Sequence, residues 1–279
     1  MRKQFTTKTD GRLDKVIGEH TSLSRKRARK IIEAGGVRVN GKKAKFASQF
    51  VVIGDTIALQ SSTPTQREFE FTVRYRDDAV VVVDKPCGLA SQPMRDGRRS
   101  HLHGLVQAEF GYAGLHHRLD TPASGLMLFS LKKQHNAAIA EAFRSHSINR
   151  TYQAVVVGDP GSSGEWQMQI DDKSAHTSFR RLASADGMSL IEVMLKTGRT
   201  HQIRIHSAQA GHPIVGDRRH GGAAGQLWPR LALHAIQLSF EHPQTRKPIT
   251  VRAPIPVDLV ELWRPLDPVR QCSPATATD

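Results

Sequence analysis

One short polar segment constrains the fold most, because it divides the chain into two parts with different patterns. Residues 60–66 read Gln-Ser-Ser-Thr-Pro-Thr-Gln, without a large apolar side chain. This composition is typical of a linker. A chain of 279 residues is long enough for one large domain and one small one. We therefore predict a small domain over residues 1–60, a linker over 61–69, a large domain over 70–266 and a disordered polar tail over 267–279.

The small domain has the pattern of two short helices followed by strands. Leu13, Val16 and Ile17 fall at helical spacing, which indicates a first helix. Ser24 is a suitable N-cap for a second helix, which the glycines at 35 and 36 end. Asn40-Gly41 after an apolar run is a strong signal for a hairpin turn. The predicted elements are helices over residues 11–20 and 25–33, a hairpin that begins at 37–39, and a last strand that includes Val51, Val52 and Ile53 and is followed by Gly54-Asp55 and residues 56–59.

Positive charge is concentrated in this small domain. The whole chain holds 40 Lys and Arg against 26 Asp and Glu, a net charge of +14. Residues 1–60 hold 14 Lys and Arg against five Asp and Glu, a net charge of +9. This asymmetry indicates a polyanionic partner. A basic helix could also bind anionic lipid, but its narrow apolar face is needed for packing on the hairpin, which favours phosphate. The expected phosphate contacts are Arg25, Lys26, Arg27, Arg29, Lys30, Arg38, Lys42 and Lys43.

Patterns in the large domain alternate between strands and helices without regular β-α repeats. The continuous Val run within residues 79–84 is typical of a buried strand. The predicted strands are 68–75, 79–84, 125–131, 152–157, 191–195 and 231–240, and the predicted helices are 102–110, 134–146 and 201–211. This mixture predicts an α+β fold around a mixed, mainly antiparallel sheet.

Several classes of protein do not fit the composition. No apolar run approaches the ~20 residues needed to span a membrane, and the N-terminus lacks the apolar core of a signal peptide. The two cysteines, Cys87 and Cys272, are far apart and do not suggest a disulfide framework. The 14 histidines show no ligand set with metal-site spacing. We expect a cytoplasmic monomer that has no membrane partner, no metal and no cofactor.

Residues 116–130 carry the most functional information in the chain. They read His-His-Arg-Leu-Asp, then Thr-Pro-Ala-Ser-Gly, then an apolar strand-like run. This order places Asp120 in a loop that a buried element holds in place. A fixed carboxylate next to an arginine suits a nucleophile or an electrostatic catalyst, whereas most Asp-Thr-Pro sequences only close a turn. The local pattern leaves both interpretations open.

Five stretches, in order along the chain, resemble the motifs of the RluA family of RNA pseudouridine synthases. The resemblance extends from about residue 70 to residue 262. One position departs from the family pattern, because Ala123 stands where a threonine is common. The matching stretches are Lys85-Pro86-Cys87-Gly88, His117-Arg118-Leu119-Asp120 with Ser124-Gly125-Leu126, Arg150-Thr151-Tyr152, residues 197–206 with 211–217, and residues 230–235 with His242-Pro243. The small domain resembles the alpha-L RNA-binding module, which is named after a ribosomal small-subunit protein.

The resemblance implies the pseudouridine synthase fold and the isomerisation of uridine, a reaction that needs no cofactor. It assigns the catalytic work to Asp120, a supporting guanidinium to Arg204 and a base-stacking ring to Tyr152, which could otherwise be a core tyrosine. An arginine beside Asp120 would keep the carboxylate ionised and fix its rotamer. Arg199 is the alternative for that role, and Arg204 could instead contact phosphate.

The resemblance also implies how the uridine is bound. The base must leave its stack before Asp120 reaches it, and Arg118 is expected to fill the vacated space. We expect Leu126 and Ile205 to form apolar walls of the uracil pocket and Arg199 to contact the substrate. Lys85-Pro86 is expected to shape the rim of the cleft, and Lys85 is not expected to be catalytic.

The implied function has two alternatives. The preferred substrate is ribosomal RNA, because the small domain resembles that of family members that act on large-subunit ribosomal RNA. Transfer RNA is the alternative substrate. A non-catalytic RNA-binding or ribosome-assembly protein is the alternative function, and the presence of Asp120, Tyr152 and Arg204 disfavours it. The chemical route of the aspartate, whether through the sugar, the base or a glycal, is left open.

Overall fold

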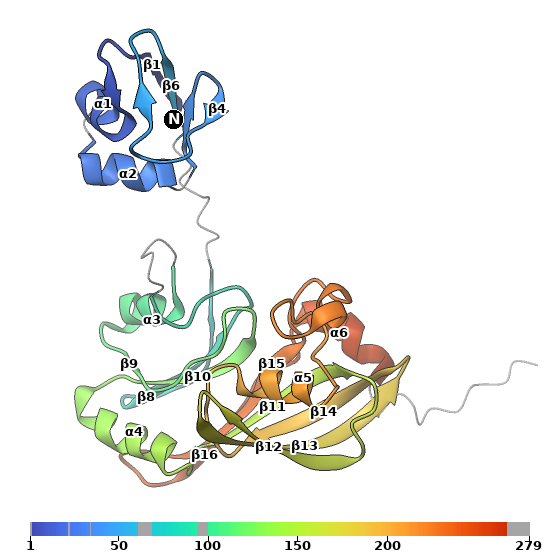
Figure 1. The fold of residues 1–279 in the computed structure, drawn as a ribbon. Coiled ribbons are helices and arrows are strands. Elements are labelled where there is room, and N and C mark those ends of the chain that lie inside the picture. The colour runs from blue at the N-terminus through green and yellow to red at the C-terminus, as the bar shows by residue number, and fades with distance from the viewer. Residues whose placement is uncertain (1, 22, 34, 61–68, 94–99, 267–279) are drawn as a thin grey trace, which may run out of the picture. The chain divides into compact units, whose positions relative to one another are not determined.

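The chain forms two units, each with its own apolar core. The computed structural model describes residues 2–21, 23–33, 35–60, 69–93 and 100–266. The first unit spans Met1–Arg67 and the second spans Glu68–Asp279 (Figure 1). The predicted linker lies outside the described residues except for Phe69, and so does the predicted tail. The predicted domain boundaries therefore stay predictions. No helix in the described part of the chain is long and apolar enough to cross a membrane.

The first unit packs two helices against a small antiparallel sheet. Its core is formed by apolar residues of both helices and of strands β3, β5 and β6. The four-stranded sheet has the order β1-β6-β3-β4, and β2 pairs with β5. The elements are β1 (Arg2–Thr6), β2 (Gly11–Arg12), α1 (Leu13–His20), α2 (Arg25–Glu33), β3 (Val37–Val39), β4 (Lys42–Lys43), β5 (Phe50–Val51) and β6 (Thr56–Gln60).

Local sequence signals explain the ends of α2 and the turn of the hairpin. The backbone N–H of Arg27 donates to Ser24 Oγ over 3.3 Å, as expected for an N-cap. After the helix, Gly35 has a φ of 75°, and the N–H of Gly36 donates to the carbonyl of Ile31 over 2.9 Å. This is the pattern of a Schellman C-terminus. Asn40 and Gly41 have φ angles of 49° and 77°, as a type I′ turn requires.

Three details of the first unit differ from the sequence prediction. The first helix begins at Leu13, because residues 11 and 12 pair with β5 instead. Val52 and Ile53 do not belong to a strand: they lie in the turn between β5 and β6 and are exposed. Strand β1 was not predicted, and it pairs with β6 along its whole length. A short polar strand such as β1 gains its partner only from the tertiary fold.

The second unit is built around one ten-stranded sheet of order β12-β13-β14-β11-β15-β10-β8-β7, with β16 on β15 and β9 on β10 (Figure 1). All pairs are antiparallel except β10 with β15, so the predicted mixed, mainly antiparallel sheet is confirmed. The strands are β7 (Thr72–Arg76), β8 (Val80–Lys85), β9 (Gly114–Leu115), β10 (Ser124–Ser130), β11 (Asn149–Val157), β12 (Ser163–Ile170), β13 (Lys173–Ala185), β14 (Met188–Leu195), β15 (Leu233–Glu241) and β16 (Pro248–Arg252).

Helices cover both faces of this sheet. Residues of β8 and β10 alternate between two apolar cores: Met127 and Phe129 face one, and Leu126 and Leu128 face the other. The first core also takes side chains from α3, α5 and α6, and the second takes Ile139 from α4. Burial on both faces explains the unbroken apolar runs of the two strands. The helices are α3 (Leu102–Phe110), α4 (Asn136–Arg144), α5 (Gln202–Gln209) and α6 (Val257–Trp263).

The long hairpin β12–β13 and the strand β16 were not predicted. In β12, Trp166 and Ile170 are the buried side chains, and the other six positions are at least partly accessible. A strand with so few buried apolar residues shows no clear alternation in the sequence.

Candidate active site

Asp120 lies in the loop between β9 and β10, at the middle of the large sheet. Strand β10 pairs with β8 on one side and, in parallel, with the start of β15 on the other. Strand β11, which carries Tyr152, pairs with β15. Helix α5 carries Arg204. The sheet thus brings three segments that are distant in sequence to the Asp120 loop.

Lys85 holds this loop from the buried side. Its side chain is fully buried, and its ammonium donates to the carbonyl oxygens of Ala123 over 2.6 Å and Leu89 over 2.8 Å. Further contacts reach the carbonyls of Pro86 over 3.0 Å and Thr121 over 3.4 Å. Burial lowers the pKa of Lys85 to about 7. The prediction that Lys85 shapes the cleft rim is wrong, because its side chain is fully buried. It joins the Asp120 loop, through Thr121 and Ala123, to the segment that follows β8.

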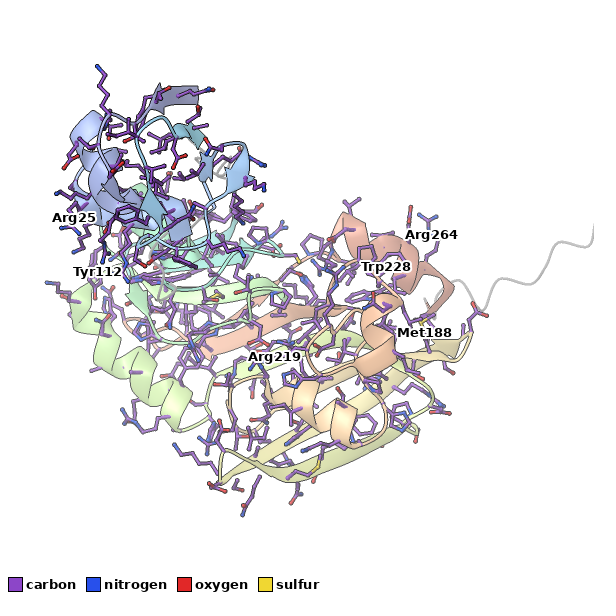
Figure 2. All side chains as sticks on the ribbon, turned by 45° about the horizontal axis from the view of Figure 1, so that its top comes forward. Arg25, Tyr112, Met188, Arg219, Trp228 and Arg264 are labelled. Atoms are coloured by element: carbon purple, nitrogen blue, oxygen red, sulfur yellow. The ribbon has the colours of Figure 1, made fainter. Side chains whose placement is uncertain are left out.

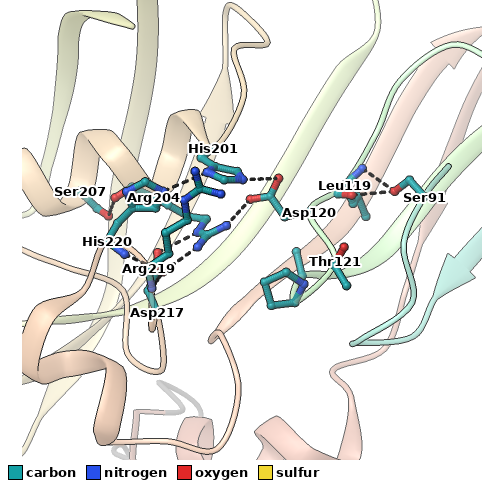
Figure 3. A network of polar contacts seen from close by, with 12 residues as sticks. Ser91, Leu119, Asp120, Thr121, His201, Arg204, Ser207, Asp217, Arg219 and His220 are labelled. Carbon is teal, nitrogen blue, oxygen red and sulfur yellow. Dashed lines mark hydrogen bonds and ion pairs between the residues drawn. The ribbon is translucent and has the colours of Figure 1, made fainter. Parts of the chain in front are cut away.

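Two further contacts hold the residues on either side of Arg118. Ser91 Oγ donates to the carbonyl of Leu119 over 2.6 Å and accepts from its N–H over 3.0 Å (Figure 3). His117 Nε2 accepts from the backbone N–H of Leu128 over 3.0 Å, and its ring stacks on Phe143. Burial lowers the pKa of His117 to about 3, so the ring is neutral. The loop is therefore anchored at both ends, and Asp120 has a defined position.

Arg204 joins Asp120 to a second carboxylate. Its Nη1 donates to Asp120 Oδ2 over 2.8 Å, while Nε and Nη2 bind both oxygens of Asp217 over 2.8 and 2.7 Å (Figure 3). Burial alone would lower the pKa of Arg204, but the hydrogen bonds to Asp217 and Asp120 raise it. The predicted ion pair between Asp120 and Arg204 is present. Arg204 binds a single oxygen of Asp120, because the fork of its guanidinium is occupied by Asp217.

Asp217 was not recognised as a site residue from the sequence. It is buried, and it also accepts from the backbone N–H groups of Arg219 and His220 over 3.0 and 3.1 Å. Burial would raise the pKa of Asp217, but the hydrogen bond from Arg204 and those from the two backbone groups lower it. Asp217 thus stays ionised and holds Arg204 against Asp120. Its signal in the sequence was its place at the end of the Gly-His-Pro-Ile-Val-Gly-Asp stretch.

The other oxygen of Asp120 faces His201, which in turn contacts His220. Neither histidine was recognised as a site residue from the sequence. His201 Nε2 is 3.7 Å from Asp120 Oδ1, and His201 Nδ1 is 2.9 Å from His220 Nε2 (Figure 3). His201 immediately precedes α5. Gln202, its neighbour, accepts from Thr197 Oγ1 and from the N–H of Arg199 and so fixes the turn before the helix.

Asp120 separates two cavities. The larger cavity, of about 900 Å³, contains Tyr152 and the arginines Arg118, Arg150 and Arg199. The second cavity, of about 470 Å³, contains Arg218 and Arg219. Asp120, Thr121 and His201 line both. The size of the larger cavity lies in the range of roughly 300–1,000 Å³ that is common for small-ligand sites.

Tyr152 lies at the floor of the larger cavity. It is 5% exposed and packs with the first apolar core, as a core tyrosine does. It also borders the cavity, as a ring that stacks on a base would have to. Burial raises the pKa of Tyr152. The positive charge of Arg150 opposes this shift, and the negative charge of Asp120 adds to it. A small extension of about 60 Å³ between Asp120 and Tyr152 is bounded by Ile203 and Leu233.

Three other predicted site residues have distinct outcomes. Arg199 lines the larger cavity, but its Nε donates to the carbonyl of Ser174 over 3.1 Å and not to Asp120. Leu126 was expected in the pocket wall, but it faces the second apolar core, on the side of the sheet opposite to Tyr152. Ile205 was also expected there, but in α5 it is Ile203 that borders the cavity. Both wall predictions are wrong, because only the tertiary fold decides which face of a strand or helix meets the cavity.

The predicted phosphate contacts of the first unit lie at its surface, apart from Lys30, whose side chain lies outside the part that the structure describes. Arg25, which is labelled in Figure 2, and its neighbours along the exposed side of α2 point to solvent. Arg29 pairs with Glu33, and Arg38 donates to the carbonyl of Gly41. The exposed members of the predicted set are Arg25, Lys26, Arg27, Arg29, Arg38, Lys42 and Lys43. No group of three His, Cys, Asp or Glu side chains in the described ranges is arranged to hold a metal ion.

Comparison with known proteins agrees with this architecture. The model of the RNA pseudouridylate synthase family matches residues 79–209, and that of the S4 domain matches residues 11–57. Ribosomal large subunit pseudouridine synthase D of Xanthomonas campestris is 32% identical over 91% of this chain and 88% of its own length. The protein of the same name from Xylella fastidiosa is 33% identical over 92% of this chain and 90% of its own.

A solved structure has a similar fold over about two thirds of this chain. The human protein RNA Pseudouridylate Synthase Domain Containing 4 aligns with a TM-score of 0.56 at 22% identity. The alignment covers 69% of this chain and 92% of the human one. At this identity the likeness concerns the fold, and it agrees with the predicted α+β class.

Proposed function

This chain belongs to the RluA family of RNA pseudouridine synthases, and we propose that its substrate is ribosomal RNA and that Asp120 acts on the glycosidic bond of the target uridine. The position of Asp120, held by Arg204 at the boundary of two cavities, is the observation that carries the proposal. The two synthase D relatives are named for the ribosomal large subunit, which supports the choice of RNA.

The reaction breaks the bond from N1 of uracil to C1′ of ribose and joins C5 to C1′. An ionised carboxylate suits this chemistry, since it can attack an electron-poor carbon or stabilise positive charge there, as in glycosidases. The carboxylate of Asp120 is partly accessible and faces both cavities. Arg204 Nη1 donates to one of its oxygens over 2.8 Å and so fixes that oxygen.

Tyr152 and Arg118 are proposed to handle the base. A uracil that has left its stack can lie in the larger cavity against the ring of Tyr152, and stacking on an aromatic ring is worth ~1–3 kcal/mol per base. Arg118 is exposed on the same loop as Asp120 and borders that cavity. It is therefore placed to enter the space that the base vacates. Arg150 and Arg199 contribute positive charge along the same wall.

The first unit is proposed to bind the RNA backbone. The S4 domain match covers α2 and the hairpin, where the exposed basic residues gather. Contacts to phosphates fix the orientation of a protein on its RNA but do not by themselves read a sequence. The predictions that the protein is monomeric and cytoplasmic stay predictions.

The experiment that tests the function replaces Asp120 with Asn. The amide keeps the shape of the carboxyl group but is neither a nucleophile nor an anion, so isomerisation should fall below detection. Tritium release from RNA labelled at C5 of uridine measures turnover, and filter binding should show an RNA affinity within a few-fold of the wild type. Substantial turnover by Asp120→Asn would sink the catalytic assignment.

The substrate is tested separately by mapping pseudouridine in total RNA. Cells with and without the protein should differ at one or more ribosomal positions, and re-expression should restore them. A difference confined to transfer RNA would overturn the choice of ribosomal RNA and leave the enzymatic assignment intact.

A further inference from the structure

His201 has a backbone conformation that requires an explanation. Its φ of 56° and ψ of 23° lie in the left-handed region, directly before α5. A residue with a Cβ atom is destabilised in that region by about 1–2 kcal/mol. Such a conformation persists where the surrounding structure holds it. At the N-terminus of α5 it directs the imidazole ring toward the Asp120 loop (Figure 3).

The ring of His201 connects two groups through its two nitrogens. Nδ1 is 2.9 Å from Nε2 of His220, and Nε2 is 3.7 Å from Oδ1 of Asp120. The other oxygen of Asp120 is bound by Arg204 over 2.8 Å. Each carboxylate oxygen of Asp120 therefore faces a nitrogen of a different side chain, one from the N-cap of α5 and one from its first turn.

Burial and the positive charges nearby keep the ring of His201 neutral. Burial lowers the pKa of His201, the Asp120 carboxylate opposes this shift, and Arg204, Arg219 and His220 lower the pKa further. Burial also lowers the pKa of His220, and Asp217 and Asp120 oppose that shift. A neutral imidazole carries a single N–H, so the position of that proton decides what Asp120 meets.

Electrostatics selects one proton arrangement for the pair. The contact between the two rings needs one donor and one acceptor. If His220 Nε2 donates, His201 Nδ1 accepts and the proton of His201 sits on Nε2, facing Asp120. The opposite arrangement would turn a lone pair of His201 toward a carboxylate, which only accepts hydrogen bonds. The first arrangement is therefore the favourable one.

We propose that His201, with its tautomer set by His220, is a positioning residue that holds Oδ1 of Asp120 while Arg204 holds Oδ2. Two fixed oxygens define the plane of the carboxylate and so the direction in which it meets the glycosidic bond. The gap of 3.7 Å is longer than a hydrogen bond, and contacts of this kind shorten when the substrate is bound. The inference rests on the proposed role of Asp120.

Two substitutions of His201 test the roles of its two ring nitrogens separately. Asn places its amide near the position of Nδ1 and is tolerated in the left-handed region, so His201→Asn should keep the backbone and the contact to His220 but lose the contact to Asp120. Gln places its amide near the position of Nε2, so His201→Gln should keep a donor to Asp120. Single-turnover rates at saturating enzyme should fall about 10- to 100-fold for Asn, the range for loss of a hydrogen bond to a charged group, and much less for Gln.

His146 provides a control for backbone strain in the Gln variant. It is a second histidine in the left-handed region, with a φ of 58°, and it is exposed. His146→Gln should lower the melting temperature by about as much as His201→Gln. A much larger fall in melting temperature for His201→Gln would show that this substitution disturbs the fold. Its single-turnover rate would then be corrected for the unfolded fraction before it is compared with the rate of His201→Asn.

The pH profile gives a readout that a purely structural residue would not change. Protonation of His201 removes the acceptor at Nδ1 and breaks the arrangement with His220, so the wild-type single-turnover rate should fall in acid. In His201→Gln this step is absent, and the acid limb should move to lower pH. For His220, Gln keeps an Nε2 donor whereas Leu does not, so His220→Leu should be slow and His220→Gln close to the wild type.

The outcomes distinguish this inference from the proposed function. A wild-type rate in His201→Asn, or equal losses in the Asn and Gln variants, would overturn the contact between Nε2 and Asp120. A wild-type rate in His220→Leu would overturn the tautomer control, and an unmoved acid limb in His201→Gln would overturn the positioning role. Turnover by Asp120→Asn, measured in parallel, would instead remove the proposed function itself.

Discussion

At the residue scale, Arg204 determines the geometry around Asp120, because it is shared between two carboxylates. Its planar fork binds Asp217 through two nitrogens and leaves Nη1 for Asp120. Arg204 and Asp217 are both buried, so neither charge is compensated by water. Removing one partner from a buried ion pair costs about 3–5 kcal/mol. Asp217 therefore matters to Asp120 although it does not touch it.

Arg204→Lys should lower catalysis far more than binding. A lysine supplies a point charge on a flexible stem and cannot reproduce the planar fork on Asp217 together with the contact to Asp120. We expect the single-turnover rate to fall about 100-fold or more, which corresponds to about 3 kcal/mol, with an RNA affinity within a few-fold of wild type. Arg199→Lys is the comparison, because Arg199 lines the larger cavity without touching Asp120. It should weaken binding more than turnover, and the same pattern in Arg204→Lys would refute the pairing.

At the element scale, the parallel contact between β10 and β15 places the Asp120 loop beside the strand that supports β11. Ser124 and Gly125 pair with His234 and Ala235. Ser124 Oγ also lies 2.9 Å from His234 Nδ1 and accepts from Arg230 over 2.8 Å. Gly125 has a φ of 115°, and a Cβ atom on it would lie 2.4 Å from the carbonyl oxygen of Ala235. The two strands can approach this closely only because residue 125 has no side chain.

Gly125→Ala should therefore destabilise the second unit strongly. The added methyl group meets backbone atoms that cannot rotate away, and we expect a loss of about 2–4 kcal/mol together with reduced turnover. Gly161→Ala is the matched control: its φ is 91°, but nothing lies within 4 Å of the added atom. It should show only the strain of the backbone, about 1 kcal/mol. Thermal unfolding of both variants measures the difference, and equal losses would contradict the close approach.

Two histidines of the second unit, His117 in the Asp120 loop and His234 in β15, should make this unit sensitive to acid. Burial lowers the pKa of His117 to about 3 and that of His234 to about 4, below the usual value of 6.5. Between pH 6.5 and about 4 the unfolded chain binds protons at both rings and the folded chain does not. The free energy of unfolding should fall as the pH falls through this range, by about 1.4 kcal/mol per pH unit for each histidine.

A variant without His234 isolates the contribution of that histidine to the pH dependence of stability. His234→Gln removes one titrating ring, so the slope of the free energy of unfolding against pH should decrease by about one proton between pH 4 and 6.5. Urea unfolding at several pH values measures this slope. An unchanged slope in the variant would show that His234 is protonated in the folded state.

At the scale of the whole molecule, each unit contains a core of its own. The first core is formed by the helices and strands of Met1–Arg67, and the two others lie on the faces of the large sheet. Most of the net positive charge, +9 of +14, is on residues 1–60 of the first unit, whereas Asp120, Arg204 and Tyr152 are on the second unit. Binding of the backbone and chemistry on the base are thus assigned to separate units.

Removal of residues 1–60 should weaken RNA binding and flatten its salt dependence. Each phosphate contact contributes a slope of about −0.9 on duplex and about −0.7 on single-stranded RNA in a plot of log affinity against log salt. Turnover of a short stem-loop should survive at saturating protein, because the second unit keeps its cores. The double variant Lys26→Gln, Arg27→Gln changes two exposed residues of α2 and should reduce the slope by one to two contacts. An unchanged slope after truncation would place the backbone contacts in the second unit.

The sequence by itself determined the parts of the protein that depend on neighbours along the chain. The caps of α2, the Asn40-Gly41 turn and the helix over residues 102–110 follow from local preferences, and the structure has them as predicted. The Val run within 79–84 indicated a buried strand, and the structure shows β8 there with Val80 to Val83 all buried. The order of the motifs also indicated the family and singled out Asp120.

Only the tertiary structure decided which side chains meet around Asp120. Arg204 was placed beside Asp120 through the resemblance, but Asp217, His201 and His220 were not, because the chain separates them from Asp120 by about 80 to 100 residues and long-range contacts leave no local pattern. The sheet also decided that Leu126 faces away from Tyr152 and that Lys85 lies beneath the loop. The side on which a strand residue lies is fixed by the pairing register, since a shift of one residue exchanges the two faces, and that register depends on the whole fold.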